Sequence, residues 1–252
     1  VCIKNKGYNI WETPVCGYYV AGPGELFDAA SYPWGWEQSD YDDSGWIKAR
    51  QELAGSMKGG ADYPGRLLVP TPIPPMDYRV ERFSSVRKAD GFKLPKNFPS
   101  QKQTFTIPAN SKIHLILDQG QLTTGYLSML FSRGKEAEVR LGYTEAYCSN
   151  PATGAKENRN ELGGKTFVGY EDKIICDGGD NRTYTNLWWR TWRYVDVRIE
   201  TKNEPLVIED IYSTYSAYPF VKETCFAAPG NEYLEKILEI GWRTARLCAN
   251  ET

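Results

Sequence analysis

This chain has one long segment with a helical pattern, at its C-terminal end. Because the rest of the chain carries strand and turn signals, the fold is limited to a mainly β class. The segment's apolar residues recur at helical spacing along one face: Leu234, Ile237, Leu238, Trp242, Ala245 and Cys248. Asn231 follows Pro229 and Gly230 and is the predicted N-cap. The pattern continues to Thr252 without a stop signal. Two interpretations stay open, a terminal helix packed on the chain's own sheet or the first helix of a longer helical domain, and we expect the second.

Short segments of alternating hydrophobicity make up most of the remaining chain. Apolar residues occupy every second position in three segments, at residues 113–117, 127–131 and 139–143. Further strand signals lie at residues 104–108, 170–176, 192–200 and 206–215. Because side chains alternate between the two faces of a strand, this pattern places one face in a core. We predict a mainly β fold, with two antiparallel β-sandwich (jelly-roll-like) domains followed by one C-terminal α-helix.

A proline-rich stretch divides the chain. Residues 63–78 contain Pro70, Pro72, Pro74 and Pro75, which exclude a helix or a central strand. The sequence therefore predicts a partial accessory β-sandwich at residues 1–75, ending in this connector. A β-sandwich domain follows at residues 76–218, and residues 219–252 form a linker and the first helix of a truncated helical barrel. A long polar loop at residues 149–164 is expected to be functional or mobile.

Charge and cysteine usage exclude several classes of protein. The net charge is −2 with no basic tract, so we expect no nucleic-acid partner. No apolar run reaches the roughly 20 residues that span a membrane. The six cysteines are widely spaced without a CxxC pair, which argues against structural zinc and favours free thiols. A periplasmic or extracellular location is favoured over the cytoplasm only if the longer protein carries a signal peptide.

The search for catalytic residues yields none. His114 is the only histidine, so multi-histidine metal sites are excluded, and a structural role is favoured over a catalytic triad. No GxGxxG or GxSxG motif occurs, and no spacing singles out a carboxylate pair among the acidic residues. No cofactor is expected. Calcium is the alternative at Asp40, Asp42 and Asp43, although Gly45 makes a simple turn the better explanation.

Aromatic residues supply the candidate contact sites. The chain has 8 Trp, 17 Tyr and 9 Phe. Trp34 and Trp36, in a Gly- and Pro-bearing segment, either stack on sugar rings or close the end of a sandwich core. Near residue 190, strand alternation divides a tryptophan cluster between the core and an outer face that could pack on a neighbouring domain. The predicted domain-interface residues are Trp188, Trp189, Trp192 and, on the helix, Trp242.

Three segments together resemble a known family. They are WWRTWRYVDVRIE at residues 188–200, PLVIEDIYSTY at residues 205–215 and the helix NEYLEKILEIGWRTARLCANET. Their succession is similar to the junction in bacterial α-L-rhamnosidases, where a final sandwich strand leads into the first helix of an (α/α)6 barrel. Residues 117–147 resemble the sandwich that precedes this barrel, and YDDSGW with the proline-rich connector fits the accessory β-domains.

The resemblance implies a function for a longer protein. Family members are inverting glycoside hydrolases that release terminal α-L-rhamnose without a metal in the chemical step. Their general acid lies on an Asp-Cys-Pro motif after a segment like RTARLCANET, and their general base lies further on, so neither maps onto this chain. Asn250 stands where many relatives have histidine. Some members carry a calcium-dependent rhamnose-binding sandwich, whose ligand set does not match here.

The chain is therefore expected to be a non-catalytic β-sandwich fragment of such an enzyme. A carbohydrate-binding module and a purely structural or interface domain are the alternatives. The implied partners are a rhamnose-containing carbohydrate and the missing catalytic barrel, and a homodimer is a further expectation.

Overall fold

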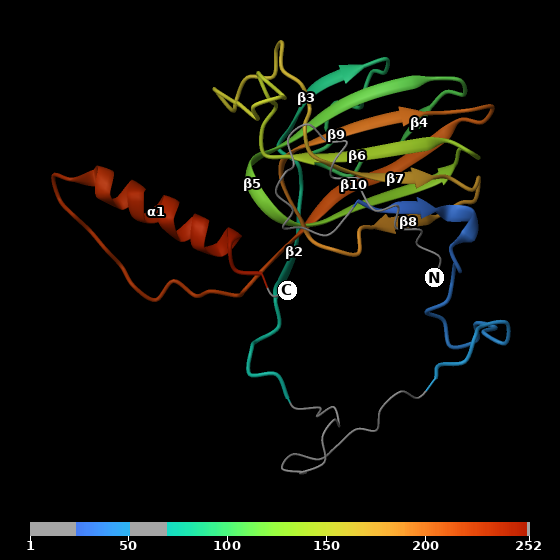
Figure 1. The fold of residues 1–252 in the computed structure, drawn as a ribbon, viewed down its shortest axis with the longest axis horizontal. Coiled ribbons are helices and arrows are strands. Elements are labelled where there is room, and N and C mark those ends of the chain that lie inside the picture. Colours follow the sequence, from blue (N-terminus) through green and yellow to red (C-terminus); the bar gives the residue numbers. More distant parts are fainter. Residues whose placement is uncertain (1–23, 51–69, 251–252) are drawn as a thin grey trace. The chain divides into compact units, whose positions relative to one another are not determined.

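The computed structural model describes residues 24–50 and 70–250. Within them, residues up to Tyr32 and from Met76 onward form one compact unit, and residues between Pro33 and Pro75 form another. The first unit is a curled β-sheet with one α-helix, α1 (Glu232–Leu247) (Figure 1). No helix in these residues combines the length and apolar character that crossing a membrane requires.

Ten strands and one short 3-10 helix make up the rest of the regular structure in the described residues. In chain order they are β1 (Leu26–Asp28), η1 (Ala29–Ser31), β2 (Asp77–Glu81), β3 (Ser85–Asp90), β4 (Phe105–Ile107), β5 (Lys112–Arg133), β6 (Glu138–Thr144), β7 (Tyr170–Ile175), β8 (Arg182–Thr185), β9 (Arg190–Glu200) and β10 (Leu206–Ala217).

Strand β5 connects the two layers of a sandwich. Its first part, up to Asp118, pairs with β3 and β9, and its last part pairs with β8 and β10. The register shifts between Asp118 and Thr123, where the strand passes from one layer to the other. The first layer therefore has the order β3-β5-β9-β6-β7-β1, and the second contains β8, β5, β10, β2 and β4. Every pair is antiparallel except β1 with β7.

The core lies between these layers, as the alternation predicts. Leu115 and Leu117 of β5 face Val197 and Val195 of β9, and all four are buried. Burying each such side chain contributes about 1.5–3 kcal/mol to folding. Gly125 allows β5 to approach β10, since a Cβ there would lie 2.2 Å from the Thr214 carbonyl oxygen. Close packing of the second layer therefore depends on a residue without a side chain.

The prediction of a mainly β chain with one C-terminal helix is confirmed, and each strand predicted after residue 100 overlaps an observed strand. Four strands, β1, β2, β3 and β8, were not predicted, and neither was the parallel pairing of β1 with β7. Cys2, Cys16 and much of residues 1–75 lie outside the described residues, and the division into an accessory and a main sandwich therefore stays a prediction.

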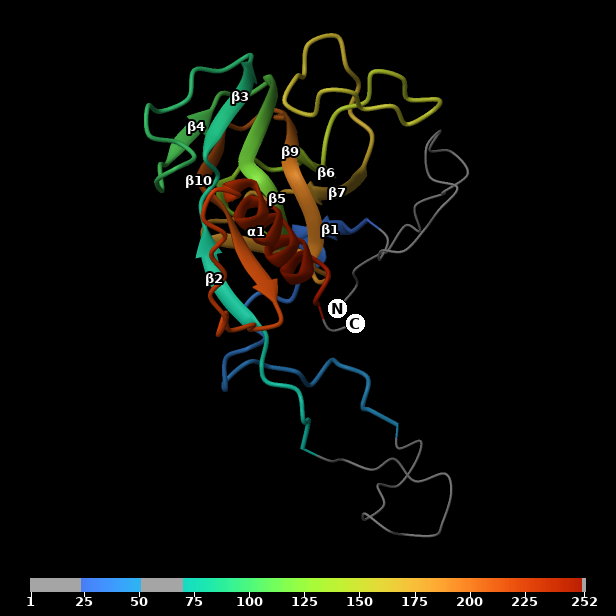
Figure 2. The ribbon, with the colours of Figure 1, turned by 90° about the vertical axis from the view of Figure 1, so that its left-hand side faces the viewer.

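Helix α1 is attached to the sandwich mainly at its C-terminal end. The backbone N–H of Tyr218 donates to the carbonyl of Ala249 at 2.6 Å. The Arg246 guanidinium lies 5.0 Å from the centre of the Tyr215 ring and 3.9 Å from the Asp77 carboxylate. The helix stands out from the strands in Figure 1 and lies in front of them in Figure 2. Asn231 begins the helix as predicted, but its side chain makes no capping hydrogen bond.

Candidate functional site

The long loop after β6, residues 145–169, covers the outer face of the first layer. Tyr147 of the loop forms a small buried cluster with Ile116 and Tyr194 of the sheet, and Leu162 and Phe167 pack against this cluster. The strand below is shaped for this contact, because a Cβ on Gly142 would lie 2.5 Å from the Phe167 ring. The loop that was expected to be functional or mobile is thus packed on the sheet at several points.

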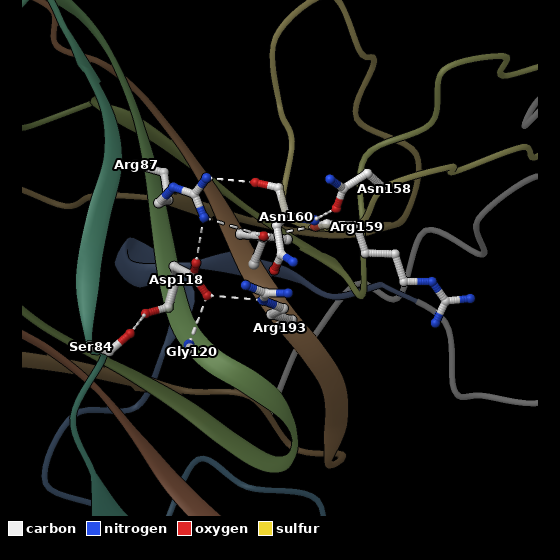
Figure 3. A network of polar contacts seen from close by, with 9 residues as sticks. Ser84, Arg87, Asp118, Gly120, Asn158, Arg159, Asn160 and Arg193 are labelled. Atoms are coloured by element: carbon white, nitrogen blue, oxygen red, sulfur yellow. Dashed lines mark hydrogen bonds and ion pairs between the residues drawn. The ribbon is translucent and has the colours of Figure 1, made fainter.

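Asp118 anchors the same loop through a polar network (Figure 3). Its carboxylate accepts hydrogen bonds from Arg87 Nη1 at 2.9 Å, Arg193 Nε at 3.3 Å and the Gly120 N–H at 2.7 Å. Arg87 then donates from Nη2 to the Asn160 carbonyl at 2.7 Å. We call Asp118, Arg87, Arg193 and their loop contacts the Asp118 network.

The chemistry of the Asp118 network is that of an anchor. Asp118 is buried, and its carboxylate accepts hydrogen bonds from two guanidinium groups and a backbone N–H. The hydrogen bond to Asp118 is the main cause that raises the pKa of Arg87. Tyr194 adds a second attachment, since its hydroxyl donates to the Arg159 carbonyl at 2.9 Å. The network therefore fixes residues 159–160 onto β3, β5 and β9.

His114 belongs to a second polar group under the loop. Its Nε2 lies 2.8 Å from Asp196 Oδ2, which also accepts from the Tyr147 hydroxyl at 2.5 Å. Burial raises the pKa of Asp196, but hydrogen bonds from His114 and Tyr147 and the charge of Arg198 outweigh it and lower that pKa. No Ser or Cys nucleophile contacts His114 within the described residues, so the geometry agrees with the structural role predicted for it.

A cavity of about 420 Å³ opens beside His114 at the end of this sheet face. Its charged lining mixes both signs: Asp90, Lys112, Glu138, Arg140, Arg198 and Glu200. Lys112 and Glu200 are themselves paired at 3.3 Å. Such a balanced lining does not select an anionic or a cationic ligand.

A third group, in the interior, contains two carboxylates and one guanidinium. Arg190 Nη2 lies 2.9 Å from Asp172 and 3.3 Å from Glu25, and all three side chains are buried. Glu25 also accepts from the Leu187 N–H at 2.8 Å and from the Tyr184 hydroxyl at 3.1 Å. Burial, and then the nearby charge of Asp172, raise the pKa of Glu25. These carboxylates are enclosed, so they serve to join β1, β7 and β9 rather than to act on a substrate.

The aromatic candidates occupy different environments. Trp36 is 48% exposed and Trp34 is half-buried, both in the smaller unit. Trp188 is 41% exposed and stacks on the half-buried Trp189, with ring centres 6.5 Å apart. Trp192 is fully buried and packs on Tyr143, so its ring has no surface for a neighbouring domain. This burial corrects the interface expectation for Trp192, because its strand phase points into the core.

The turn considered for calcium is held by its own backbone. The Ser44 N–H donates to Asp42 Oδ1 at 3.0 Å, and the Trp46 N–H donates to the Asp43 carbonyl at 2.9 Å. No three His, Cys, Asp or Glu side chains converge on a common point in the part of the chain that the structure describes. The four described cysteines are free thiols, with Cys148 and Cys176 buried and Cys225 and Cys248 exposed.

The apolar face of α1 is exposed. Ile237 is 57% exposed and Leu238 50%, and no residue of the helix is buried. Trp242 is half-buried and makes a ring contact with Phe220, at 5.9 Å between centres. A groove of about 500 Å³ runs along this face beside Phe226. Exposed apolar side chains gathered in this way are typical of protein–protein or ligand-binding surfaces.

The sequence did not predict the Asp118 network or the Asp196 group. One signal was available, because His114 and Asp118 on β5 and Asp196 on β9 are opposite in phase to the buried apolar residues of the same strands. A single such residue is common, but three on two adjacent strands indicate a covered polar face.

Comparison with known proteins shows a shared fold. No family model matches the chain, and no curated protein matches it. Among solved structures, a GH78 family rhamnosidase of Bacillus sp. GL1 matches with a TM-score of 0.50 and 19% identity over 64% of this chain. A rhamnosidase from Klebsiella oxytoca with rhamnose bound gives a TM-score of 0.48 at 12% identity, over 70% of this chain and 36% of that one.

The alignment with the Bacillus sp. GL1 rhamnosidase covers only 16% of that protein. At this identity the likeness concerns the fold alone. The described strands are therefore a β-sandwich of a kind that also occurs within a rhamnosidase.

Proposed function

We propose that this chain is a non-catalytic β-sandwich region of an α-L-rhamnosidase-like glycoside hydrolase whose parent releases terminal α-L-rhamnose from glycosides. In this proposal α1 packs against a helical catalytic domain. The observation that carries it is the exposed apolar face of α1, with Ile237, Leu238 and Trp242 on a helix attached mainly at one end. Burying side chains of this size is worth about 1.5–3 kcal/mol each, which favours a packed partner.

Two further observations support the proposal. The sandwich fold also occurs in a rhamnosidase that is several times longer than the aligned region. The described carboxylates that are buried are engaged by arginines, histidine or backbone N–H groups, as Asp118, Asp172 and Asp196 are. A general acid and a general base would then come from the helical domain.

The direct test assays this chain and the longer protein on an aryl α-L-rhamnoside. The longer protein is expected to release rhamnose, and this chain alone is expected to release none. Release of rhamnose by the chain alone would contradict the proposal that its general acid and general base lie outside this chain.

The docking role of α1 is tested in the longer protein. Replacing Ile237 and Leu238 together by Asp should lower its thermal stability and activity, because two carboxylates would enter an apolar interface. Lys236→Asp, one position away on the exposed side of the helix, is the matched control and should change little. Equal behaviour of the two variants would contradict the docking role.

A carbohydrate-binding module is the second candidate, favoured by the half-exposed ring of Trp36. Titration with rhamnose and rhamnosyl oligosaccharides, with and without calcium, should then release heat and shift the tryptophan fluorescence. Trp36→Ala should abolish both the heat and the fluorescence shift. Trp46→Ala, which removes a ring of similar exposure from the same unit, should preserve them. Absence of both signals at millimolar sugar removes this candidate.

A further inference from the structure

The outer face of the second layer carries aromatic and hydroxyl side chains. Across the strands, Val80 of β2 lies opposite Thr214 of β10, which lies opposite Tyr126 of β5. In the next row, Tyr212 lies opposite Ser128, and Ser128 lies opposite Thr185 of β8. Residues on the other side of these strands, such as Leu127, Met129 and Ile211, are in the core. This outer face, the tyrosine face, is therefore opposite to the packed interior.

The tyrosine face is accessible at one edge. Tyr78 is 60% exposed and Val80 is 62% exposed. Tyr78 and Tyr126 stack with ring centres 5.8 Å apart and 20° between their planes. Partial burial, together with a hydrogen bond to Tyr78, raises the pKa of Tyr126 to about 12. The Tyr126 hydroxyl, like any phenol, can donate as well as accept hydrogen bonds.

The side chains of the tyrosine face are uncharged, and the charges around it are paired. Arg82 is bound to Asp210 at 2.7 Å. Arg79 points to the opposite side of β2, where it lies over the Tyr215 ring at 4.4 Å and pairs with Asp77 at 2.8 Å. No unpaired charge thus offers a contact to an ionic ligand at this edge of the described sheet.

We infer that the tyrosine face binds a neutral oligosaccharide. Ring faces stack on the C–H faces of sugars, and the hydroxyls of Thr185, Tyr212 and Thr214, which are not buried, match sugar hydroxyls as donors and acceptors. Three adjacent strands give a flat width of roughly 10 Å, the scale of a short oligosaccharide.

This inference goes beyond the proposed function, since it concerns a different surface from α1 and does not require any hydrolytic activity. It also differs from the Trp36 site, which lies in the other compact unit.

The test is native electrophoresis of the full chain in gels that contain galactomannan, arabinoxylan or mixed-linkage β-glucan, with polygalacturonate as the acidic comparison. At least one neutral polymer should retard the chain. Tyr78→Ala should raise the dissociation constant derived from the retardation about tenfold, since loss of an aromatic contact of this kind costs about 1.4 kcal/mol. Tyr233→Ala, which removes a tyrosine of equal exposure from α1, should leave it unchanged.

Three results would overturn the inference: no retardation by any neutral polymer, retardation of Tyr78→Ala equal to that of the unsubstituted chain, or retardation by polygalacturonate only. Sedimentation could also detect a dimer of the chain. If Tyr78→Ala dissociates that dimer, the inference is overturned in favour of a protein interface. Tyr78→Phe, which keeps the ring, is the second variant and should lose less affinity than Tyr78→Ala. Rhamnoside hydrolysis is measured separately from polysaccharide retardation. Failure of the retardation test therefore leaves the proposed function untouched, and failure of the hydrolysis test leaves this inference untouched.

Discussion

At the scale of single residues, buried charges hold this sandwich together by satisfying one another. Asp118 joins Arg87 and Arg193 from strands that are far apart in the sequence. A buried charge without a partner is costly, so each such residue is tolerated only because its partners are in place.

Asp118→Asn tests this dependence. The substitution should lower the free energy of unfolding by about 2–3 kcal/mol, because it leaves two partly buried guanidinium groups without their counter-charge. Urea unfolding measures the change, and proteolysis after Arg159 should quicken as the loop loosens. Asp90→Asn, which breaks an exposed pair with Lys88, is the control and should cost less than about 0.5 kcal/mol. Similar losses in the two variants would contradict the anchoring role.

Asp196 makes a pH-dependent contribution. Its folded pKa is lowered, so its stabilising effect is complete above the unfolded pKa of about 3.9 and is lost as the pH falls through the folded pKa. Unfolding measured between pH 7 and pH 2.5 should therefore show a smaller acid-induced loss of stability in Asp196→Asn than in the parent chain. Identical slopes in the two proteins would show that other carboxylates determine the acid transition.

At the scale of elements, the loop at residues 145–169 behaves as a covering layer for β5, β6 and β9. Its aromatic and leucine side chains complete a small core with Ile116 and Tyr194, and its backbone carbonyls accept from Arg87 and Tyr194. A loop with such attachments adds to the packed structure instead of acting as a free flap.

The contact between Gly142 and Phe167 makes this covering layer testable. Gly142→Ala should cost about 1–3 kcal/mol, because the new methyl group overlaps the ring. The double variant with Phe167→Ala should show that the Gly142 substitution costs much less once the ring is gone. Additive costs in the double-mutant cycle would mean that the loop does not press on β6.

At the scale of the whole molecule, α1 and the sandwich differ in how they expose apolar residues. The sandwich buries its own apolar residues, whereas the helix presents Ile237, Leu238 and Ile240 to solvent. In the proposed parent enzyme the helical domain would cover this face, and in the isolated chain a second copy would be the simplest substitute.

Sedimentation velocity over a range of concentrations tests this association. The chain alone should self-associate as its concentration rises, and replacement of Ile237 and Leu238 by Lys should shift it to monomer. Lys236→Glu, which changes charge without altering the apolar face, serves as the control. A monomeric parent chain at all concentrations would count against both a homodimer and an interface role for α1.

Local sequence patterns were sufficient to predict the strands and the helix whose hydrophobic residues recur with a clear period. Alternation at residues 113–117, 127–131 and 139–143 predicted parts of β5 and β6, and helical spacing predicted α1 to within a residue of its observed start. Strands β2, β3 and β8 were not predicted because their residues are mostly half-buried or exposed, which leaves little hydrophobic period, and β1 has only three residues.

What the sequence by itself determined is therefore the mainly β class, the main strands and the amphipathic helix, because each depends on side chains a few positions apart. Only the tertiary structure decided which strands pair, that Trp192 is buried while Trp188 is exposed, and that Asp118 meets Arg87 and Arg193. It also brought Glu25 to Arg190, 165 residues further along the chain. Such contacts depend on how the sheet curls, and no local spacing records that geometry.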